Sequence, residues 1–175
     1  MGSFEEWAQR FREIGLWPRP IKLGTKACQI KNWQLPDDQQ PPAELERWPI
    51  RYRNFGIGLL MGSPLPDGTT LGALDVDRDE YVGLADVILR SPVSGRIGKK
   101  GAVYFVRVAG NFGNPEFRVG GSQAKQWGKV AECLFRKKLC VIPPTIHPET
   151  NRPYRWIGTP LHEVDFASLP LIGDR

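Results

Sequence analysis

The stretch Leu71-Gly72-Ala73-Leu74-Asp75-Val76-Asp77 is a short apolar run that ends in two carboxylates separated by one residue. If it forms a β-strand, side chains alternate between its faces, so Asp75 and Asp77 point one way while Leu74 and Val76 point the other. Two carboxylates at this spacing repel each other unless a cation lies between them, and their hard oxygen atoms suit Mg²⁺ or Mn²⁺. The stretch is therefore compatible with a metal site or with a strand that runs into an acidic, solvated turn.

Length and composition indicate a single globular domain in a reducing compartment. A chain of 175 residues is long enough to bury a core without disulfides. The cysteines, Cys28, Cys133 and Cys140, are odd in number and match neither a disulfide framework nor a zinc knuckle. The chain opens on an amphipathic stretch rather than a signal peptide, and it has no apolar run of the roughly 20 residues that a bilayer requires. We therefore expect a soluble, cytoplasmic protein with no membrane partner.

Positive charge is concentrated in one part of the chain. The net charge is +5, but the segment from Arg90 to Lys138 contains 11 Lys or Arg and only two acids, Glu116 and Glu132, which makes it +9 and the remainder −4. Aromatic residues are interleaved with these cations. Such a segment suits a phosphate-rich partner, because Lys and Arg neutralise phosphates and aromatic faces stack on bases. A solvated basic surface around core aromatics would have the same composition.

Hydrophobic periodicity predicts three helices. The first runs from about Phe4 to Gly15, with Ser3 and Glu6 as a capping box. The second runs from about Ala43 to Trp48, directly after a proline pair that suits a helix entry. The third covers about Glu80 to Leu89 and is expected to lead back across a sheet.

Period-two alternation between turn residues predicts several short strands. Residues 54–62 are expected to form a hairpin with the acidic strand through a loop at 64–69, whereas residues 20–33 should be extended and irregular. Further strands are expected at Ala102–Val108, Glu116–Val119, Val130–Leu134 and Leu139–Ile142. The fold class is therefore α+β, with a mixed or antiparallel sheet and the helices to one side.

Four sequence features follow one another in an order that is more specific than any of them alone. They are LDVD at residues 74–77, GRIGKKGAVYFVR at 95–107, VAECL at 130–134 and IPPTIHPETNRPYRW at 142–156. In this order they resemble the N-terminal primase-polymerase domain of the archaeo-eukaryotic primase superfamily, over roughly residues 4–156. The resemblance implies an RRM-like sheet core with an adjoining α/β unit, and template-directed nucleotidyl transfer as its activity.

The resemblance also implies roles for the acidic residues. Asp75 and Asp77 would hold two divalent cations, Mg²⁺ or Mn²⁺, and Glu132 would supply a third carboxylate from a neighbouring strand. Two metals about 4 Å apart position an attacking 3′-hydroxyl and neutralise charge on both reacting oxygens. The alternative for Glu132 is a salt bridge to Arg136 or Lys129.

One position departs from the family pattern. The family usually carries a histidine just before the aromatic pair of its second motif, where it contacts the incoming triphosphate, and aligning Tyr104 and Phe105 places Ala102 there. Either catalysis is lost, or triphosphate binding has moved to the basic residues of the same stretch. We favour the second interpretation, because Arg and Lys bind phosphate in any protonation state and glycines at 98 and 101 let the backbone approach it.

The candidate nucleotide-binding residues are therefore Arg96, Lys99, Lys100, Arg107 and His147, the last from the tail motif. Arg96→Ala or Lys99→Ala should raise the dNTP requirement sharply. Prolines on both sides fix the backbone around His147. We expect its ring to make either a nucleotide contact or a structural hydrogen bond.

The basic segment also supplies candidate nucleic-acid contacts, which are Lys125, Lys129, Arg136 and Lys137. We expect Trp33, Trp48 and Trp127 to pack in the fold rather than to stack on bases. His162 lies outside every motif, and we assign it no role.

Together these features predict a DNA primase-polymerase catalytic domain at residues 1–160, followed by a C-terminal tail or the start of a linker at 161–175. Its substrates would be NTPs or dNTPs and a single-stranded DNA template or primer, in the replication of a phage, plasmid or other mobile element. Such domains commonly precede a helicase, and the sequence shows no Walker A motif, so a helicase is expected only as a partner or as another part of a longer protein. The alternatives are a non-catalytic domain that binds single-stranded nucleic acid and a metal-dependent nuclease.

Overall fold

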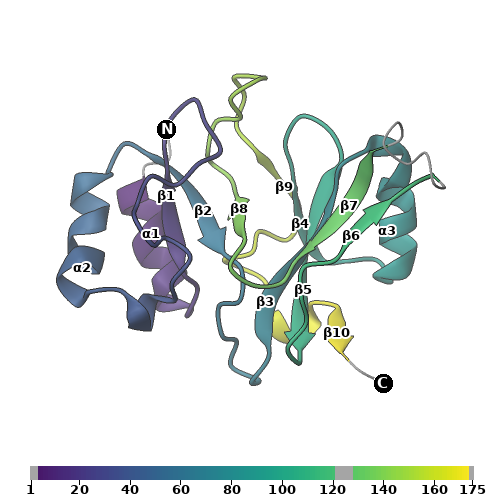
Figure 1. The fold of residues 1–175 in the computed structure, drawn as a ribbon, viewed down its shortest axis with the longest axis horizontal. Coiled ribbons are helices and arrows are strands. Elements are labelled where there is room, and N and C mark those ends of the chain that lie inside the picture. The colour runs from purple at the N-terminus through teal and green to yellow at the C-terminus, as the bar shows by residue number, and fades with distance from the viewer. Residues whose placement is uncertain (1–3, 121–127, 174–175) are drawn as a thin grey trace.

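The computed structural model describes residues 4–120 and 128–173, which form two β-sheets with helices packed against them (Figure 1). The α-helices are α1 (Phe4–Glu13), α2 (Pro42–Arg51) and α3 (Val82–Ile88), and short 3₁₀ turns occur at Asp37–Gln39, Asp79–Tyr81 and Phe166–Ser168. The strands are β1 (Pro18–Ile21), β2 (Gly56–Leu60), β3 (Thr70–Val76), β4 (Ser94–Ile97), β5 (Ala102–Ala109), β6 (Glu116–Arg118), β7 (Lys129–Leu134), β8 (Leu139–Val141), β9 (Arg155–Gly158) and β10 (Leu171–Gly173).

The larger sheet has the acidic strand β3 near its centre. Its strand order is β6-β7-β3-β5-β4-β9, and β10 pairs with the C-terminal end of β5, at residues 107–109. Among the described strands of this sheet only β10 runs parallel to its partner, which confirms the expected α+β fold with a mostly antiparallel sheet. Asp75 lies opposite Glu132 on β7 and opposite Val103 on β5, so neighbouring strands flank the acidic strand on both sides.

The smaller sheet corrects the predicted hairpin. Strand β2 does not pair with β3; it lies between β1 and β8 in a separate sheet. All five residues of β2 are buried, so its backbone needs partners on both edges, and β1 and β8 provide them. The stretch expected to be irregular from residue 20 therefore begins inside strand β1. Of the predicted hairpin there remain two hydrogen bonds between residues 62–63 and Leu71, the isolated bridge between Pro64 and Thr70, and the hydrogen bond from the N–H of Leu65 to the carbonyl of Thr69.

Alternation along β3 separates two hydrophobic cores. Leu71 and Ala73 face the main core, where they join Phe105 and Leu134. The opposite face carries Val76 in a second cluster with residues from α3, β5 and β7. The period-two pattern read from the sequence is therefore confirmed, and Asp75 lies on the face of the main core.

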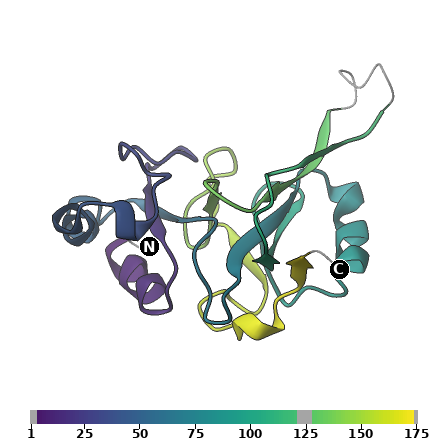
Figure 2. The same cartoon turned by 60° about the horizontal axis from the view of Figure 1, so that its bottom comes forward.

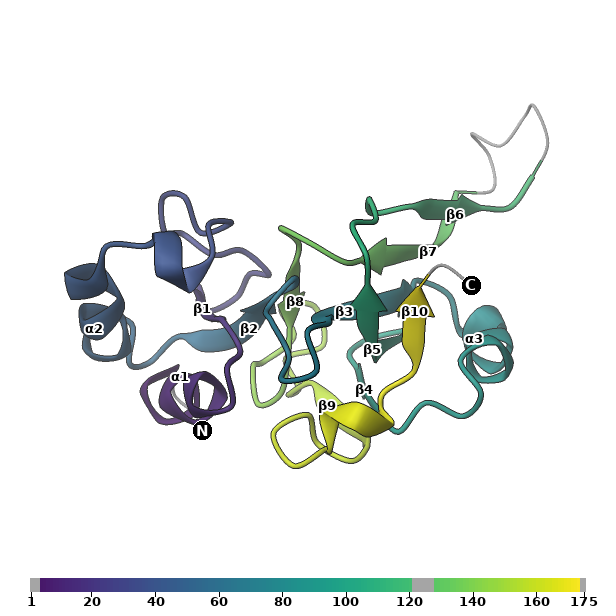
Figure 3. The same ribbon diagram turned by 90° about the horizontal axis from the view of Figure 1, so that it is seen from below.

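The helices occupy opposite ends of the molecule (Figure 3), so the expectation that they lie to one side of the sheet is wrong. Helices α1 and α2 lie beside the smaller sheet and bury Phe4, Phe11 and Trp48 in the main core, whereas α3 lies against the larger sheet. The packing role expected for Trp48 is confirmed. Helix α1 ends two residues earlier than predicted and α2 extends to residue 51. The capping residue Ser3 lies outside the described residues.

The C-terminal segment packs against the body of the protein (Figure 2). Leu161 and Leu169 are buried in the main core, and β10 adds to the larger sheet beside β5. Residues 161–173, which we expected to be a tail or linker, thus contribute to the same core as the central strands. No helix in the described part of the chain is long and apolar enough to cross a membrane.

Candidate active site

Charged side chains from distant parts of the chain meet in a cavity of about 380 Å³ at the end of β3. Its lining combines acidic, basic and aromatic groups: Lys26, Asp75, Val76, Asp77, Arg96, Lys99, Lys100, Leu139, Val141, His147, Glu149 and Tyr154. Six of the predicted site residues are in this set, namely Asp75, Asp77, Arg96, Lys99, Lys100 and His147. We call this cavity the charged pocket.

The larger sheet brings the three predicted carboxylates together. Asp75 and Glu132 are directly opposite each other on β3 and β7, and side chains of such a pair lie on the same face. Asp77 follows the end of β3, where its backbone N–H still donates to the carbonyl of Val130 (2.8 Å). Burial raises the pKa of Asp75, and the charges of Asp77 and Glu132 raise it further, while Arg96 opposes the shift. The site therefore holds Asp75 at an electrostatic cost.

Two lysines neutralise the other carboxylates. Lys129 Nζ lies 3.0 Å from Glu132 Oε1 and 3.4 Å from Asp77 Oδ2, and Lys138 Nζ lies 3.4 Å from Glu132 Oε2. Asp77 Oδ2 is buried and accepts no hydrogen bond from the described residues. The salt-bridge alternative for Glu132 is thus present with Lys129, while Arg136 instead donates to Asn111.

Arg96 is the cation that balances Asp75. Its guanidinium stacks 4.8 Å above the centre of the Tyr154 ring, and its Nε has no hydrogen-bond partner among the described residues. Cys140 lies beside it, but complete burial raises the pKa of that thiol, so it stays protonated at neutral pH. The charge that Arg96 compensates is therefore that of Asp75, and its buried Nε–H has no partner among the described residues.

The turn between β4 and β5 carries the basic residues Lys99 and Lys100. Gly101 has a φ of +62°, and its N–H donates to Asp79 Oδ1 (2.6 Å). A Cβ at Gly98 would press on the rings of Tyr154 and His147. We expected these glycines to let the backbone approach phosphate, and the structure adds a second reason, which is close packing of the turn.

Gly101→Ala should destabilise the protein by about 2–4 kcal/mol, because it adds strain at positive φ and its Cβ would overlap the carbonyl oxygen of Val76. Chemical denaturation measures this difference. Gly83→Ala is the matched control, because a Cβ at Gly83 in α3 meets open space and Ala favours a helix. Equal stabilities of the two variants would contradict the packing described for the turn.

His147 is buried beside Tyr154, with ring centres 5.1 Å apart. Its Nδ1 accepts the backbone N–H of Glu149 (3.2 Å). Burial lowers the pKa of His147, the cations Lys26, Arg96 and Lys99 lower it further, and Glu149 partly offsets this. The ring is therefore neutral at pH 7, and its proton lies on Nε2. His147 therefore makes a structural hydrogen bond through Nδ1, and its Nε2–H can still donate a hydrogen bond.

Three polar residues that the sequence did not single out for the site also line the pocket, namely Lys26, Glu149 and Tyr154. Lys26 comes from the loop after β1, and Tyr154 supplies the surface under Arg96. Glu149 holds Lys99 at 2.6 Å between exposed side chains. The YRW letters of the tail motif were the only available signal for Tyr154, and nothing local distinguishes Lys26 from its neighbours.

Arg107 is not at the charged pocket, which corrects its assignment as a nucleotide contact. Its guanidinium lies 2.5 Å from Asp67 and its Nε donates to the carbonyl of Leu169 (3.1 Å). The hydroxyl and the backbone N–H of Thr69 both donate to Asp67, and together with Arg107 they lower the pKa of Asp67 to about 2. The reason is distance along the strand: Arg107 pairs with Leu71 at the opposite end of β3 from the carboxylates.

The candidate nucleic-acid contacts are dispersed. Lys129 is engaged with the carboxylates, Arg136 pairs with Asn111, and Lys137 is exposed with a φ of +54°. Lys125 lies outside the described residues, as does Trp127. The charged pocket includes none of the described members of this group.

Ala102, the position where the family usually has a histidine, faces away from the charged pocket. It pairs with Val76 on β3 and belongs to the second apolar cluster, whereas Asp75 lies opposite Val103. In this register a histidine at residue 102 would enter that cluster rather than the pocket. The basic groups at the pocket instead come from β4 and the turn after it, from the loop after β1 and from the tail motif.

The carboxylates fit a divalent metal in kind, although their present arrangement is not that of a metal cluster. Oxygen donors on adjacent strands and the buried Asp77 Oδ2 suit Mg²⁺ or Mn²⁺. Within residues 4–120 and 128–173, however, no group of three or more His, Cys, Asp or Glu side chains lies in a position to hold a metal ion. Lys129 instead supplies the positive charge between Asp77 and Glu132.

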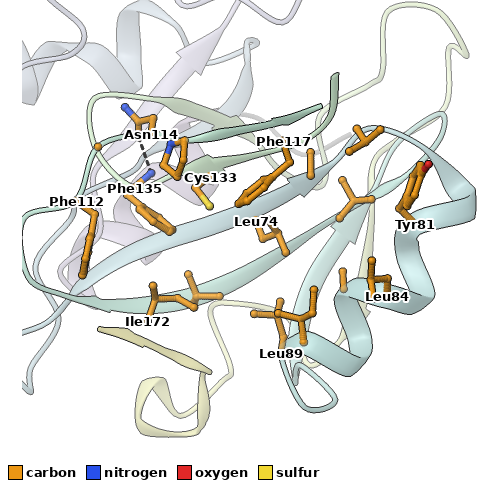
Figure 4. A pocket seen from close by; sticks show the side chains of 18 residues that line it. Leu74, Tyr81, Leu84, Leu89, Phe112, Asn114, Phe117, Cys133, Phe135 and Ile172 are labelled. Atoms are coloured by element: carbon orange, nitrogen blue, oxygen red, sulfur yellow. Dashed lines mark hydrogen bonds between the residues drawn. The ribbon is translucent and has the colours of Figure 1, made fainter. Parts of the chain in front are cut away.

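A cavity larger than the charged pocket lies beside α3 (Figure 4), on the face of β3 that carries Leu74 and Val76. It measures about 810 Å³ and lies between α3 and strands β3, β5, β6 and β7, with Leu74, Leu84, Phe117 and Phe135 among its lining residues. None of its described lining residues carries a charge. Size alone would select this cavity, but acid, base and phosphate chemistry needs the groups of the charged pocket.

Carboxylates beside arginine and lysine in one pocket are groups that can bind a divalent metal and phosphate. The sequence comparison is more specific: the model of the bifunctional DNA primase/polymerase N-terminal family (Prim-Pol) matches residues 13–171. The chain belongs to this family, and it is a primase/polymerase nucleotidyltransferase whose substrates are a DNA template and nucleotides. No curated protein matches the chain.

Proposed function

We propose that the charged pocket is the site of template-directed nucleotidyl transfer, with Asp75, Asp77 and Glu132 as the metal-binding carboxylates. The observation that supports this most directly is the pairing of Asp75 with Glu132 on adjacent strands, beside Asp77 and Arg96. Two divalent ions, Mg²⁺ or Mn²⁺, would supply charge neutralisation at the attacking and leaving oxygens. The family is generally metal-dependent, and the pair of ions at these carboxylates is our proposal.

The basic side of the pocket would bind the triphosphate. Arg96 lines the pocket and is held by Tyr154, so its guanidinium can donate to a phosphate oxygen at little cost in side-chain entropy. Lys99 and Lys100 add positive charge from the adjacent turn, and His147 offers its Nε2–H. These groups would hold the phosphates while the primer 3′-hydroxyl attacks.

Strand order supports the RRM-like core. The strands β7-β3-β5-β4 lie side by side in that order, and α3 connects β3 to β4 across the sheet. We propose that Lys125, Arg136 and Lys137 contact the template or primer backbone. Lys125 precedes β7 in the sequence and the other two follow it, and β7 carries Glu132. A mobile-element context and a helicase partner are further parts of this proposal.

One assay separates this function from its alternatives. A labelled primer on a single-stranded template is incubated with the protein, dNTPs or NTPs, and Mg²⁺ or Mn²⁺. Extension supports the polymerase, shortening of the primer supports the nuclease, and binding without either supports a non-catalytic module. Omitting the metal should stop extension, and extension that persists in EDTA would contradict the metal-dependent mechanism.

A further inference from the structure

Lys129 connects two of the three carboxylates. Its Nζ contacts Glu132 at 3.0 Å and Asp77 at 3.4 Å, while Lys138 contacts Glu132 alone. The Glu132 side chain is only 15% exposed, where a carboxylate without a counter-charge would be costly. Lys129 therefore neutralises the oxygens at the end of β3 and those on β7 at the same time.

We propose that Lys129 is a built-in counter-cation that competes with the divalent ion for Asp77 and Glu132. The inference rests on the proposed function, because it takes these carboxylates as the metal ligands. An ammonium group and a metal ion that use the same oxygens exclude each other, so each weakens the binding of the other by the same factor. The metal consequently binds the free protein more weakly than the carboxylates alone would allow.

The position of Lys129 makes such an exchange feasible. It is the first residue of β7, and its side chain is 26% exposed, so the ammonium has a path to solvent. A lysine side chain has four flexible methylene groups and reorients without a change in the backbone. The three-residue separation from Glu132 keeps the charge near the site after displacement.

Metal binding without nucleotide tests the proposal. In calorimetric titrations with Mn²⁺, Lys129→Met should bind about ten-fold more tightly than wild type, a typical size for coupling between two sites. Lys129→Arg should remain near wild type, because its charge still spans the same oxygens. Lys138→Met should have a smaller effect, since Lys138 contacts Glu132 but not Asp77. The control Lys31→Met removes an exposed lysine away from the charged pocket and should change nothing.

Thermal unfolding gives a second readout that does not depend on activity. Without metal, Lys129→Met should melt at a lower temperature than wild type, because Asp77 loses its lysine contact and Glu132 keeps only Lys138. Its melting temperature should then rise more on addition of Mn²⁺, since a ligand that binds the folded state more tightly stabilises it more.

Asp77→Asn distinguishes failure of this inference from failure of the proposed function. If Asp77→Asn binds Mn²⁺ as wild type does, the carboxylates are not the metal site and the proposed function falls with the inference. If Asp77→Asn loses Mn²⁺ binding but Lys129→Met binds no more tightly than wild type, only the competition by Lys129 is overturned.

Discussion

Replacing Asp75 by Asn should abolish primer extension and, in the absence of metal, raise the melting temperature. Loss of a metal-binding carboxylate removes several kcal/mol of transition-state stabilisation, which corresponds to a decrease in rate of about 10³-fold or more. Stability should change in the opposite direction, because burial and the charges of Asp77 and Glu132 raise the pKa of Asp75. Asparagine has nearly the same shape and carries no charge that must be buried.

The pH dependence follows from the direction of that shift. Because the pKa of Asp75 is higher in the folded protein than in the unfolded chain, its ionisation lowers the free energy of unfolding at neutral pH. The cost disappears as the pH falls through the raised pKa. The stability difference between Asp75→Asn and wild type should therefore be largest near neutral pH and shrink in acid.

Asp38→Asn is the matched control for both measurements. Asp38 is an exposed carboxylate in the 3₁₀ turn before α2, away from the charged pocket, so its replacement should alter neither extension nor melting. Extension at a wild-type rate by Asp75→Asn would remove this residue from the metal site. A lower melting temperature would show that the carboxylate stabilises the fold instead of opposing it.

Arg96→Ala should raise the nucleotide KM by about 10- to 150-fold, the range expected when one charge-assisted hydrogen bond worth about 1.5–3 kcal/mol is lost. This loss is expected because the Arg96 guanidinium lines the charged pocket and is already positioned on Tyr154. Arg96→Lys should recover part of the affinity, since it keeps the charge but loses the planar stack. Steady-state extension at varied dNTP concentration measures both effects.

Arg107→Met serves as the comparison for Arg96→Ala. It removes an arginine that pairs with Asp67 and with the carbonyl of Leu169, so it should lower stability and leave the nucleotide KM unchanged. A large rise in KM for Arg107→Met would show that overall destabilisation, rather than a phosphate contact, explains the Arg96 result. An unchanged KM for Arg96→Ala would remove Arg96 from the triphosphate site.

The sequence predicted correctly those features that depend on neighbouring residues. A strand places residues i and i+2 on one face whatever surrounds it, so the LDVD stretch was sufficient to predict the alternation of side chains that the structure shows along β3. The strand at residues 102–109 and the helix that follows Pro41 also follow from local periodicity and turn chemistry. The order of the four motifs also predicted the family, because this order is specific whereas each motif alone is not.

Other features required the tertiary structure. The hairpin prediction failed because β2 is buried on both sides and pairs with β1 and β8, a choice that depends on segments far apart in the chain. Arg107 and Arg96 look equivalent in the sequence, yet strand register places them at opposite ends of the sheet.

Asp75 and Asp77 show which features the sequence determines and which depend on the tertiary structure. The sequence by itself determined that Asp75 and Asp77 follow an alternating strand, because side-chain direction along a strand is a local property of the backbone. Only the tertiary structure decided their counter-charges: Arg96 on Tyr154 beside Asp75, and Lys129 between Asp77 and Glu132. Electrostatic partners are set by distances between strands, and those distances exist only once the strands have paired.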